Sequence, residues 1–318
     1  MPSVSVIIPA YNVEKYIART IESLLKQDFD DFEIIIINDG SSDKTVDVIN
    51  GFNDARIKLF SQDNKGSAMA RNLGISKAQG EYLMFLDGDD YYDIDCISSA
   101  YNKIKLENSD ICIFGSRFVN KNGEKVKGVI PKFVDSVDLK EHKELLLEIE
   151  NCTWDKIYRK TLIVDNDIRY PEGLYYEDFA FTFWAVIFAS KISFINRELI
   201  TYVVGRDGNA TNEMSEKVFD IFAIVEFIIE KYQEEGVLDD YYEELKAISI
   251  INIVDKLKQV ILSEDKNLKY KYLNYSYEFI KEYFGDFKSP YNLKKHPRDY
   301  IYFDKNLLKL YMIIKGVN

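Results

Sequence analysis

Two short, nearly unbroken runs of β-branched residues, Val4 to Ile8 and Glu33 to Ile37, constrain the fold most. Such runs are typical of parallel strands that are covered on both faces. Between them, apolar residues repeat with helical spacing from Ile17 to Leu25, and Asn12 stands where it would cap that helix. The sequence therefore predicts a βαβ unit at the start of an α/β protein.

The alternation of strands and helices continues to residue 116. Further strands are expected at 57–60, 82–86 and 111–115, and further helices at 45–52, 67–78 and 94–106. A parallel sheet of this kind binds its ligand beyond the carboxyl ends of the strands.

The pattern changes after Ser116. Asn122-Gly123 predicts a hairpin turn. Helices are expected at 139–149 and 178–189, with strands at 192–196 and 199–204. Helical patterns dominate from Met214 onward, so we expect a boundary near Asn212. It would separate an α/β domain, 1–212, whose two parts are about 1–116 and 117–212, from a C-terminal helical region, 213–318.

Composition is that of a cytoplasmic protein with a full hydrophobic core. The chain has 318 residues, of which 47% are hydrophobic. Its three cysteines have no paired spacing, which is typical of reduced thiols. No secretory signal pattern opens the chain, and the longest dense apolar stretch, Phe179 to Ala189, is too short to span a bilayer.

The charge is unevenly distributed. A net charge of -12 argues against nucleic-acid binding, yet Lys266 to Asn318 has eleven Lys or Arg against five Asp or Glu. Within this basic tail, Lys305 to Lys315 forms a lysine-rich, largely apolar helical pattern. Such a helix rests on the inner face of an anionic membrane, or it packs against the preceding helices or a second copy in a homo-oligomer. Both alternatives stay open.

Asp87-Gly88-Asp89-Asp90 follows the strand expected at 82–86. Three neighbouring carboxylates repel one another, and a bound cation relieves that repulsion. Their hard oxygens suit Mg²⁺ or Mn²⁺, usually together with substrate phosphates. Gly88 would allow the backbone to approach a ligand closely. The alternative is a solvated acidic turn before a helix.

Several segments, in order and at their spacings, resemble the inverting family 2 glycosyltransferases of the GT-A fold. The matching segments are Val4 to Asn12, Ile37 to Asp43, Asn64-Lys65-Gly66 with Ala70-Arg71-Asn72, Leu86 to Asp90, Trp154 to Arg159, and Tyr176-Glu177-Asp178. The resemblance covers about residues 3–210. It implies a GT-A-type, Rossmann-like and mostly parallel sheet with flanking helices, with the nucleotide-sugar half at 1–116 and the acceptor half at 117–212.

The resemblance also implies a donor site. Tyr11 would flank the nucleotide base, Asp39 would accept a hydrogen bond from a uracil N–H, and Arg71 would lie beside the base. Lys156 and Arg206 are candidates for the phosphates. The remaining candidates for nucleotide binding are Pro9, Glu14, Gly66, Asp87 and Gly88.

For catalysis, the resemblance implies Asp89 as the direct Mn²⁺ or Mg²⁺ ligand, with Asp87 on the ribose or in the metal's water shell. Asp178 would be the general base, with Glu177 as the second candidate. Acids at this place also favour a helix N-terminus, so a capping role for this pair is the alternative. The two histidines, His142 and His296, lack the surroundings of the further metal ligand that some relatives have.

The leading hypothesis is an inverting hexosyl- or N-acetylhexosaminyltransferase. It would use a UDP-sugar and a glycan or lipid-linked glycan acceptor, in bacterial surface polysaccharide assembly. One alternative is a catalytically silent nucleotide-sugar or glycan-binding protein of the same fold. The other is a sugar nucleotidyltransferase, which would need a glycine-rich phosphate loop that Pro9-Ala10-Tyr11-Asn12 does not provide.

Overall fold

The computed structural model describes residues 1–205, 215–285 and 291. The chain forms two compact units. The first consists of Met1–His142, Glu148–Gly173 and Glu177–Gly208, and the second of Lys143–Leu147, Leu174–Tyr176 and Asn209–Asn318. The boundary expected near residue 212, Arg206 and the tail helix at 305–315 all fall outside the described residues, so each stays a prediction.

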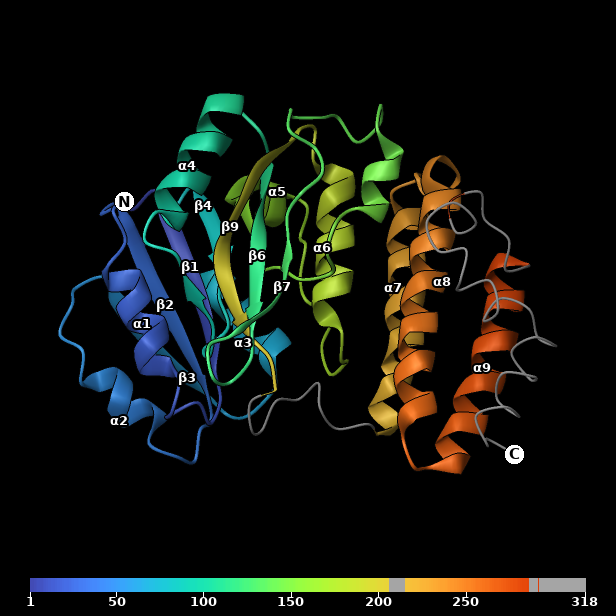
Figure 1. Ribbon diagram of the computed structural model, residues 1–318. Coiled ribbons are helices and arrows are strands. Elements are labelled where there is room, and N and C mark those ends of the chain that lie inside the picture. The colour runs from blue at the N-terminus through green and yellow to red at the C-terminus, as the bar shows by residue number, and fades with distance from the viewer. Residues whose placement is uncertain (206–214, 286–290, 292–318) are drawn as a thin grey trace. The chain divides into compact units, whose positions relative to one another are not determined.

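The first unit is an α/β domain (Figure 1). Its strands are β1 (Val4–Ala10), β2 (Phe32–Asp39), β3 (Ile57–Gln62), β4 (Tyr82–Phe85), β5 (Tyr91–Tyr92), β6 (Ile111–Val119), β7 (Lys125–Val129), β8 (Lys156–Arg159) and β9 (Ile192–Val203). Its helices are α1 (Ile17–Leu25), α2 (Thr45–Asn50), α3 (Ser67–Lys77), α4 (Cys96–Glu107), α5 (Lys160–Asp165) and α6 (Glu177–Phe188).

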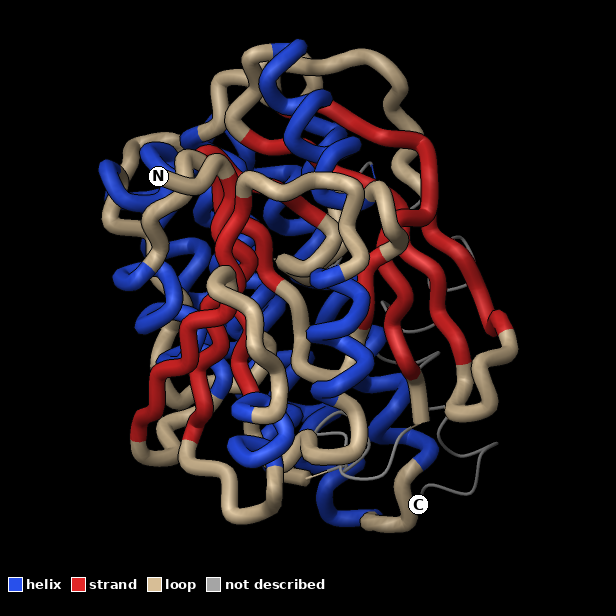
Figure 2. The backbone as a smooth tube through the Cα atoms, turned by 90° about the vertical axis from the view of Figure 1, so that its left-hand side faces the viewer, coloured by secondary structure: helices blue, strands red, loops and turns tan. Residues whose placement is uncertain are grey.

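Within the described residues, all nine strands belong to one sheet, with the order β3-β2-β1-β4-β8-β6-β9-β5 and with β7 paired to β6. Figure 2 shows the strands in red and the helices in blue. Strands β3, β2, β1 and β4 are parallel, and so are β6 and β9. Strand β8 lies antiparallel between β4 and β6. The expected α/β class with a helix-flanked sheet is confirmed, although β8, β5 and β7 make half of the sheet mixed.

The strands form where β-branched side chains are buried on both faces. Val4, Val6 and Ile8 of β1 share one core with α1, α2 and α4. On the opposite face, α3 packs tightly on β1 at Gly74, where a Cβ atom would lie 2.3 Å from Ile7 Cγ2. Helices therefore cover both faces of the sheet (Figure 1), which leaves the carboxyl edge of the parallel strands for ligands.

Three local expectations were wrong. The helix expected at 139–149 is a short 3-10 turn, η1 (Lys143–Leu147), and the two strands expected between 192 and 204 are one strand, β9, with irregular register opposite Gly115. Asn12 does not cap α1, because its φ of 51° and its side-chain contacts place it against the neighbouring loop, five residues before the helix begins at Ile17. The hairpin expected around Asn122-Gly123 joins β6 to β7.

The second unit is helical, as expected for the C-terminal region. It contains η1 and η3 (Glu216–Phe219) together with α7 (Asp220–Glu234), α8 (Leu238–Leu262) and α9 (Lys266–Phe284). Phe222, Tyr272 and Phe279 pack ring to ring in its core, with Phe222 centroids 5.2 and 5.0 Å from the other two. In the described part of the chain, no helix combines the length and the apolar character needed to cross a bilayer.

Candidate active site

The carboxyl ends of β1 and β2 are held together by side chains that bond to backbone N–H groups. Asn12 Oδ1 accepts from Ser42 N at 2.8 Å, and Glu14 Oε2 accepts from Lys44 N at 2.8 Å. Tyr11, by contrast, is 48% exposed at this edge. Glu14 therefore shapes the loop next to the predicted nucleotide site, and Tyr11 offers a ring face at its entrance.

Asp39 organises the loop between β3 and α3. Its carboxylate accepts from Gln62 Nε2 at 2.7 Å, Lys65 N at 2.8 Å and Gly66 N at 2.8 Å. Gly66, with a φ of 90°, turns the chain into α3. The side chain of Asp39 thus lies at the predicted place on the carboxyl edge, with a structural task of its own.

Hydrogen bonds from side chains to two backbone carbonyls hold the acidic loop after β4 in place. Arg19 Nη2 donates to the Asp89 carbonyl and Thr20 Oγ1 to the Asp90 carbonyl, both at 2.7 Å. Gly88 permits close packing on β1, because a Cβ atom there would lie 3.2 Å from the Pro9 carbonyl oxygen. The loop is therefore rigid, and both Asp89 and Asp90 are buried.

The three acids of this loop have different surroundings. Asp90 Oδ1 accepts from the backbone N–H of Val203 at 3.0 Å, so this side chain joins the loop to the end of β9. Asp87 Oδ1 instead accepts from Arg71 Nη2 at 2.8 Å. Asp90 is thus a structural acid, whereas Asp87 faces a buried cation.

That cation brings together two acidic segments that are about 90 residues apart in the sequence. Arg71 Nη1 lies 2.8 Å from Glu177 Oε1 and 3.3 Å from Asp178 Oδ1, both at the start of α6. Ser67 Oγ also donates to Glu177 Oε1. One guanidinium therefore links Asp87 to the acid pair that the sequence singled out.

Asp178 has a strongly altered acidity. Burial raises its pKa, the nearby Arg71 lowers it, and the carboxylates of Glu177 and Asp87 raise it again. A hydrogen bond from Thr153 Oγ1, at 3.3 Å, lowers it slightly. The resulting pKa is about 7, which suits a group that takes up a proton near neutral pH.

The site offers few carboxylates to a divalent cation. In the described residues, no three His, Cys, Asp or Glu side chains gather as a metal-binding group. Asp87 and Asp89 nevertheless stand two residues apart at the strand end, and Mg²⁺ or Mn²⁺ is commonly held by one or two carboxylates with substrate phosphates. The donor set is therefore compatible with a metal that binds together with the donor.

Lys156 was wrongly predicted to reach phosphate. Its side chain is fully buried in β8, and Nζ donates to the carbonyls of Cys152 at 2.6 Å and Glu150 at 3.0 Å and to Asp155 Oδ1 at 2.5 Å. Trp154 is 6% exposed and stacks on Tyr202, with ring centroids 5.5 Å apart. Both residues support the sheet.

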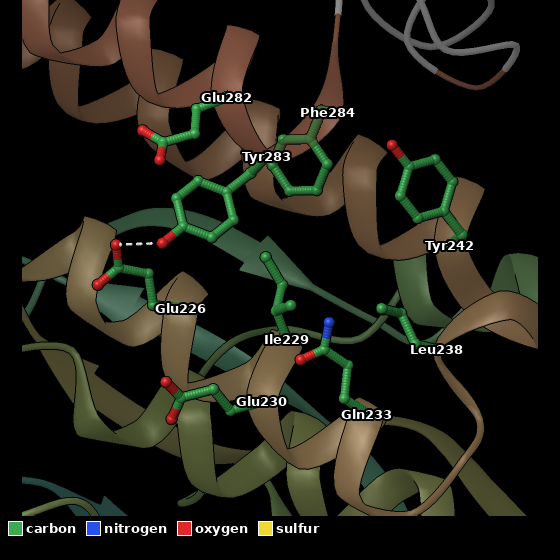
Figure 3. A pocket seen from close by; sticks show the side chains of 9 residues that line it. All are labelled: Glu226, Ile229, Glu230, Gln233, Leu238, Tyr242, Glu282, Tyr283 and Phe284. Carbon is green, nitrogen blue, oxygen red and sulfur yellow. Dashed lines mark hydrogen bonds between the residues drawn. The ribbon is translucent and has the colours of Figure 1, made fainter.

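Two contacts of the acid pair were not predicted. Ser67 and Thr153 each hold one of the two acids, and neither belongs to a pattern that would single it out. A cavity of about 300 Å³ in the second unit contains none of the predicted site residues (Figure 3). It is lined mainly by α7 and α9, and there Tyr283 Oη donates to Glu226 Oε1 at 2.7 Å.

Ligands bind at the carboxyl edge of a parallel sheet, and carboxylates there can hold a divalent cation together with substrate phosphates. The family model described as "Glycosyl transferase family 2" matches residues 5–163. The protein named "Putative glycosyltransferase EpsH" of Bacillus subtilis (strain 168) is 30% identical over 79% of this chain and 75% of its own length. The chain belongs to glycosyl transferase family 2.

Two further likenesses concern one relative, the poly(ribitol-phosphate) beta-N-acetylglucosaminyltransferase TarS of Staphylococcus aureus. It is 30% identical over 72% of this chain, and the match spans 40% of the TarS length. The crystal structure of TarS residues 1–349 with UDP-GlcNAc superposes with a TM-score of 0.69 at 26% identity, covering 89% of this chain and 82% of that one. The GT-A fold and the glycosyltransferase activity class follow from these likenesses together with the family.

Proposed function

We propose that this enzyme is an inverting hexosyl- or N-acetylhexosaminyltransferase that moves a sugar from a UDP-sugar to a hydroxyl group of a glycan or glycoconjugate. The observation that carries the proposal is the convergence of Asp87, Glu177 and Asp178 on Arg71 at the carboxyl edge of the sheet. The UDP-GlcNAc bound to TarS supports the donor class.

The nucleotide would lie over the ends of β1 and β2, between Tyr11, Asp39 and Gly66. A carboxylate has about four lone-pair sites, and three hydrogen bonds are directed at Asp39. Asp39 therefore retains the capacity to accept the N–H of a uracil ring. Tyr11, at 48% exposure, would cover the ring, and Arg206 stays a candidate for the diphosphate.

Asp89 and Asp87 would hold Mn²⁺ or Mg²⁺, which when bound to the diphosphate supplies Lewis-acid stabilisation of the leaving group. The chain itself would contribute the carboxylates of the acidic loop at the carboxyl edge of the sheet. The acidic loop is anchored by Arg19, Thr20 and Val203, so its carboxylates keep their places before the donor arrives.

Asp178 would act as the general base. The acceptor hydroxyl oxygen attacks the anomeric carbon and its proton passes to the Asp178 carboxylate, while the bond from the anomeric carbon to the diphosphate oxygen breaks and UDP leaves with that electron pair. Attack on the face opposite the leaving group inverts the anomeric centre. Glu177, paired with Arg71 and Ser67, would help to orient its neighbour.

The acceptor would be a surface glycan. TarS acts on poly(ribitol-phosphate), a bacterial polymer, and this supports a role in surface polysaccharide or glycoconjugate assembly for the present chain. Such a role would place the enzyme in the cytoplasm, where the basic tail would meet the membrane that carries a lipid-linked acceptor.

The proposal is tested with a panel of nucleotide sugars and Mn²⁺, measuring UDP release with wild type and with Asp178→Asn. We expect a UDP-sugar to be preferred, and the variant to lose roughly 10²- to 10⁴-fold in turnover while UDP binding is retained. Asp95→Asn is the matched control, because Asp95, like Asp178, lies at the N-terminal end of a helix and pairs with an arginine, Arg197, at 2.7 Å. Unchanged turnover in Asp178→Asn would exclude this base, and joint loss of UDP binding would indicate a structural role.

A further inference from the structure

The residues directly before the acid pair belong with the C-terminal helices and not with the sheet. Leu174–Tyr176 is part of the second unit, and the chain enters the first unit at Glu177, where α6 begins. Tyr175 N donates to Asp220 Oδ2 at 3.0 Å, and Asp220 is the first residue of α7. A helix that begins 45 residues later in the sequence therefore holds the backbone just before the proposed base.

Two lysines of the same helical unit hold the tyrosine rings of this segment. Lys217 Nζ, in η3, lies 4.2 Å from the centroid of the Tyr175 ring and donates to Tyr175 Oη. Lys256 Nζ, in α8, lies 4.3 Å from the centroid of the Tyr176 ring. An ammonium group over a ring face is attracted by the π-electrons of the ring. Side chains from η3, α7 and α8 thus all contact the same two residues.

The backbone of Tyr176 is held in a strained conformation. Its φ is +70°, in the left-handed region, which a bulky aromatic residue rarely adopts. Such a conformation persists only where the surrounding structure imposes it, and it occurs often at functional sites. Because Tyr176 is the last residue before α6, its dihedral angles set the direction in which that helix begins. The contacts with Asp220 and Lys256 on either side of this peptide impose the turn.

The acid pair stands where such support is needed. Glu177 and Asp178 are the first two residues of α6, and the first N–H groups of a helix lack partners within the helix, so helix ends fray. A general base must lie within hydrogen-bond reach of the hydroxyl that it deprotonates. Arg71 and Thr153 contact the Asp178 carboxylate, whereas Asp220 holds the backbone from which this side chain projects.

We propose that Asp220 is a positioning residue for the transfer reaction. Its hydrogen bond to the Tyr175 N–H fixes the turn through Tyr176, and that turn places the Asp178 carboxylate for proton transfer from the acceptor. The inference rests on the proposed function, in which Asp178 is the base. It gives the helical unit a part in the reaction, although the described site residues that the sequence predicted all lie in the first unit.

The first test is Asp220→Ala, which removes the acceptor of the Tyr175 N–H. A misplacement of about 1 Å costs roughly 100-fold in rate, so we expect kcat to fall by about that factor. UDP affinity, measured by titration, should not change, because the proposed nucleotide contacts of Tyr11, Asp39 and Gly66 come from other loops in the first unit.

Two companion variants separate the hydrogen bond from other effects of Asp220. Asp220→Asn keeps an oxygen that can accept from the Tyr175 N–H, so it should retain most of the turnover that Asp220→Ala loses. Asp239→Ala is the matched control, because Asp239 is also an acid in the first turn of a helix of this unit, α8, but its side chain is exposed. Its kcat should equal that of wild type, since loss of an acid near a helix N-terminus is all that it shares with Asp220→Ala.

Three results would overturn the inference: wild-type kcat in Asp220→Ala, equal losses of kcat in Asp220→Ala and Asp220→Asn, or a fall in UDP affinity that matches the fall in kcat. If Asp220→Ala does not fold, Asp220→Glu replaces it, because it keeps the charge and moves the carboxylate by one methylene group. We expect Asp220→Glu to lower kcat at unchanged UDP affinity, and wild-type kcat would count against the inference.

Amide hydrogen exchange of the wild type tests the contact without any substitution. The Tyr175 amide, followed by NMR, should exchange slowly with solvent, and exchange at the rate of an unprotected amide would refute the contact. The two proposals fail separately. Full turnover in Asp178→Asn defeats the proposed base, whereas an inactive Asp178→Asn together with a fully active Asp220→Ala defeats this inference alone.

Discussion

Transfer should become faster with rising pH through the neutral range, because the proposed base must be ionised to take a proton. With a pKa of about 7, Asp178 is ionised in about one molecule in ten at pH 6 and in about nine in ten at pH 8. We therefore expect kcat/KM to rise about tenfold between these pH values. The parameter kcat/KM is the right one, since it reports the pKa of the free enzyme.

The assay is UDP release under limiting substrate in buffers from pH 5 to 9, with protein integrity checked by thermal melting at each pH. Asp95→Asn should show the same rising limb as wild type. A flat profile, or a limb near pH 4 where exposed aspartates titrate, would refute the reasoning from burial and like charge.

The raised pKa of Asp178 also makes the stability of the folded protein depend on pH. The pKa of Asp178 in the folded protein lies above the ordinary aspartate value of 3.8, so the folded protein binds more protons than the unfolded chain between about pH 4 and pH 7. The contribution of Asp178 to stability is therefore present at low pH and is lost as pH rises through 7. A pKa difference of three units corresponds to at most about 4 kcal/mol in the free energy of unfolding. The actual contribution is smaller, because the Asp178 side chain is 22% exposed. Asp178→Asn cannot ionise and should escape the loss in urea unfolding at pH 5 and 8. A wild type that loses no stability relative to it would contradict the argument.

Three further predictions concern single contacts. Thr153→Val removes the hydrogen bond that lowers the pKa of Asp178, so the acid limb should move to higher pH. Lys156→Met leaves Asp155 buried without its partner and should cost about 3 to 5 kcal/mol in urea unfolding, against no measurable change for exposed Lys15→Met. Gly40→Ala should cost about 1 to 3 kcal/mol by the same measurement, because φ is +71° and the added Cβ would lie 2.8 Å from Asn64 N. An acid limb that does not move in Thr153→Val would contradict the first prediction. Unfolding free energies equal to wild type in Lys156→Met or Gly40→Ala would contradict the other two.

Periodicity was enough to predict the first half of the fold. The β-branched runs of β1 and β2 and the apolar spacing of α1 require burial on both faces of a parallel sheet, and that sheet is present. Strand β8 was missed because two of its four residues, Lys156 and Arg159, are cations. A central strand can include Lys156 because its buried amine donates hydrogen bonds to backbone carbonyls.

The candidate site was predictable in its members but not in its connections. The motifs named Arg71, Asp87, Glu177 and Asp178, but they did not indicate that the arginine pairs with all three acids. Its partners at 177 and 178 lie more than 100 residues away, so no local pattern records the contact. The prediction for Lys156 was wrong for a related reason: its partners are mainly backbone carbonyls, which no side-chain motif reveals.

The absence of a side chain at position 74 has a consequence for how this enzyme is altered. Since α3 rests directly on Ile7 there, the helix has no space in which to shift toward the sheet, and any larger residue would lift it away. Changes that seek a new donor or acceptor are therefore better directed at the exposed loops around Tyr11 and Lys121. A library that varies the buried face of α3 would mostly sample enzymes whose reacting groups no longer meet.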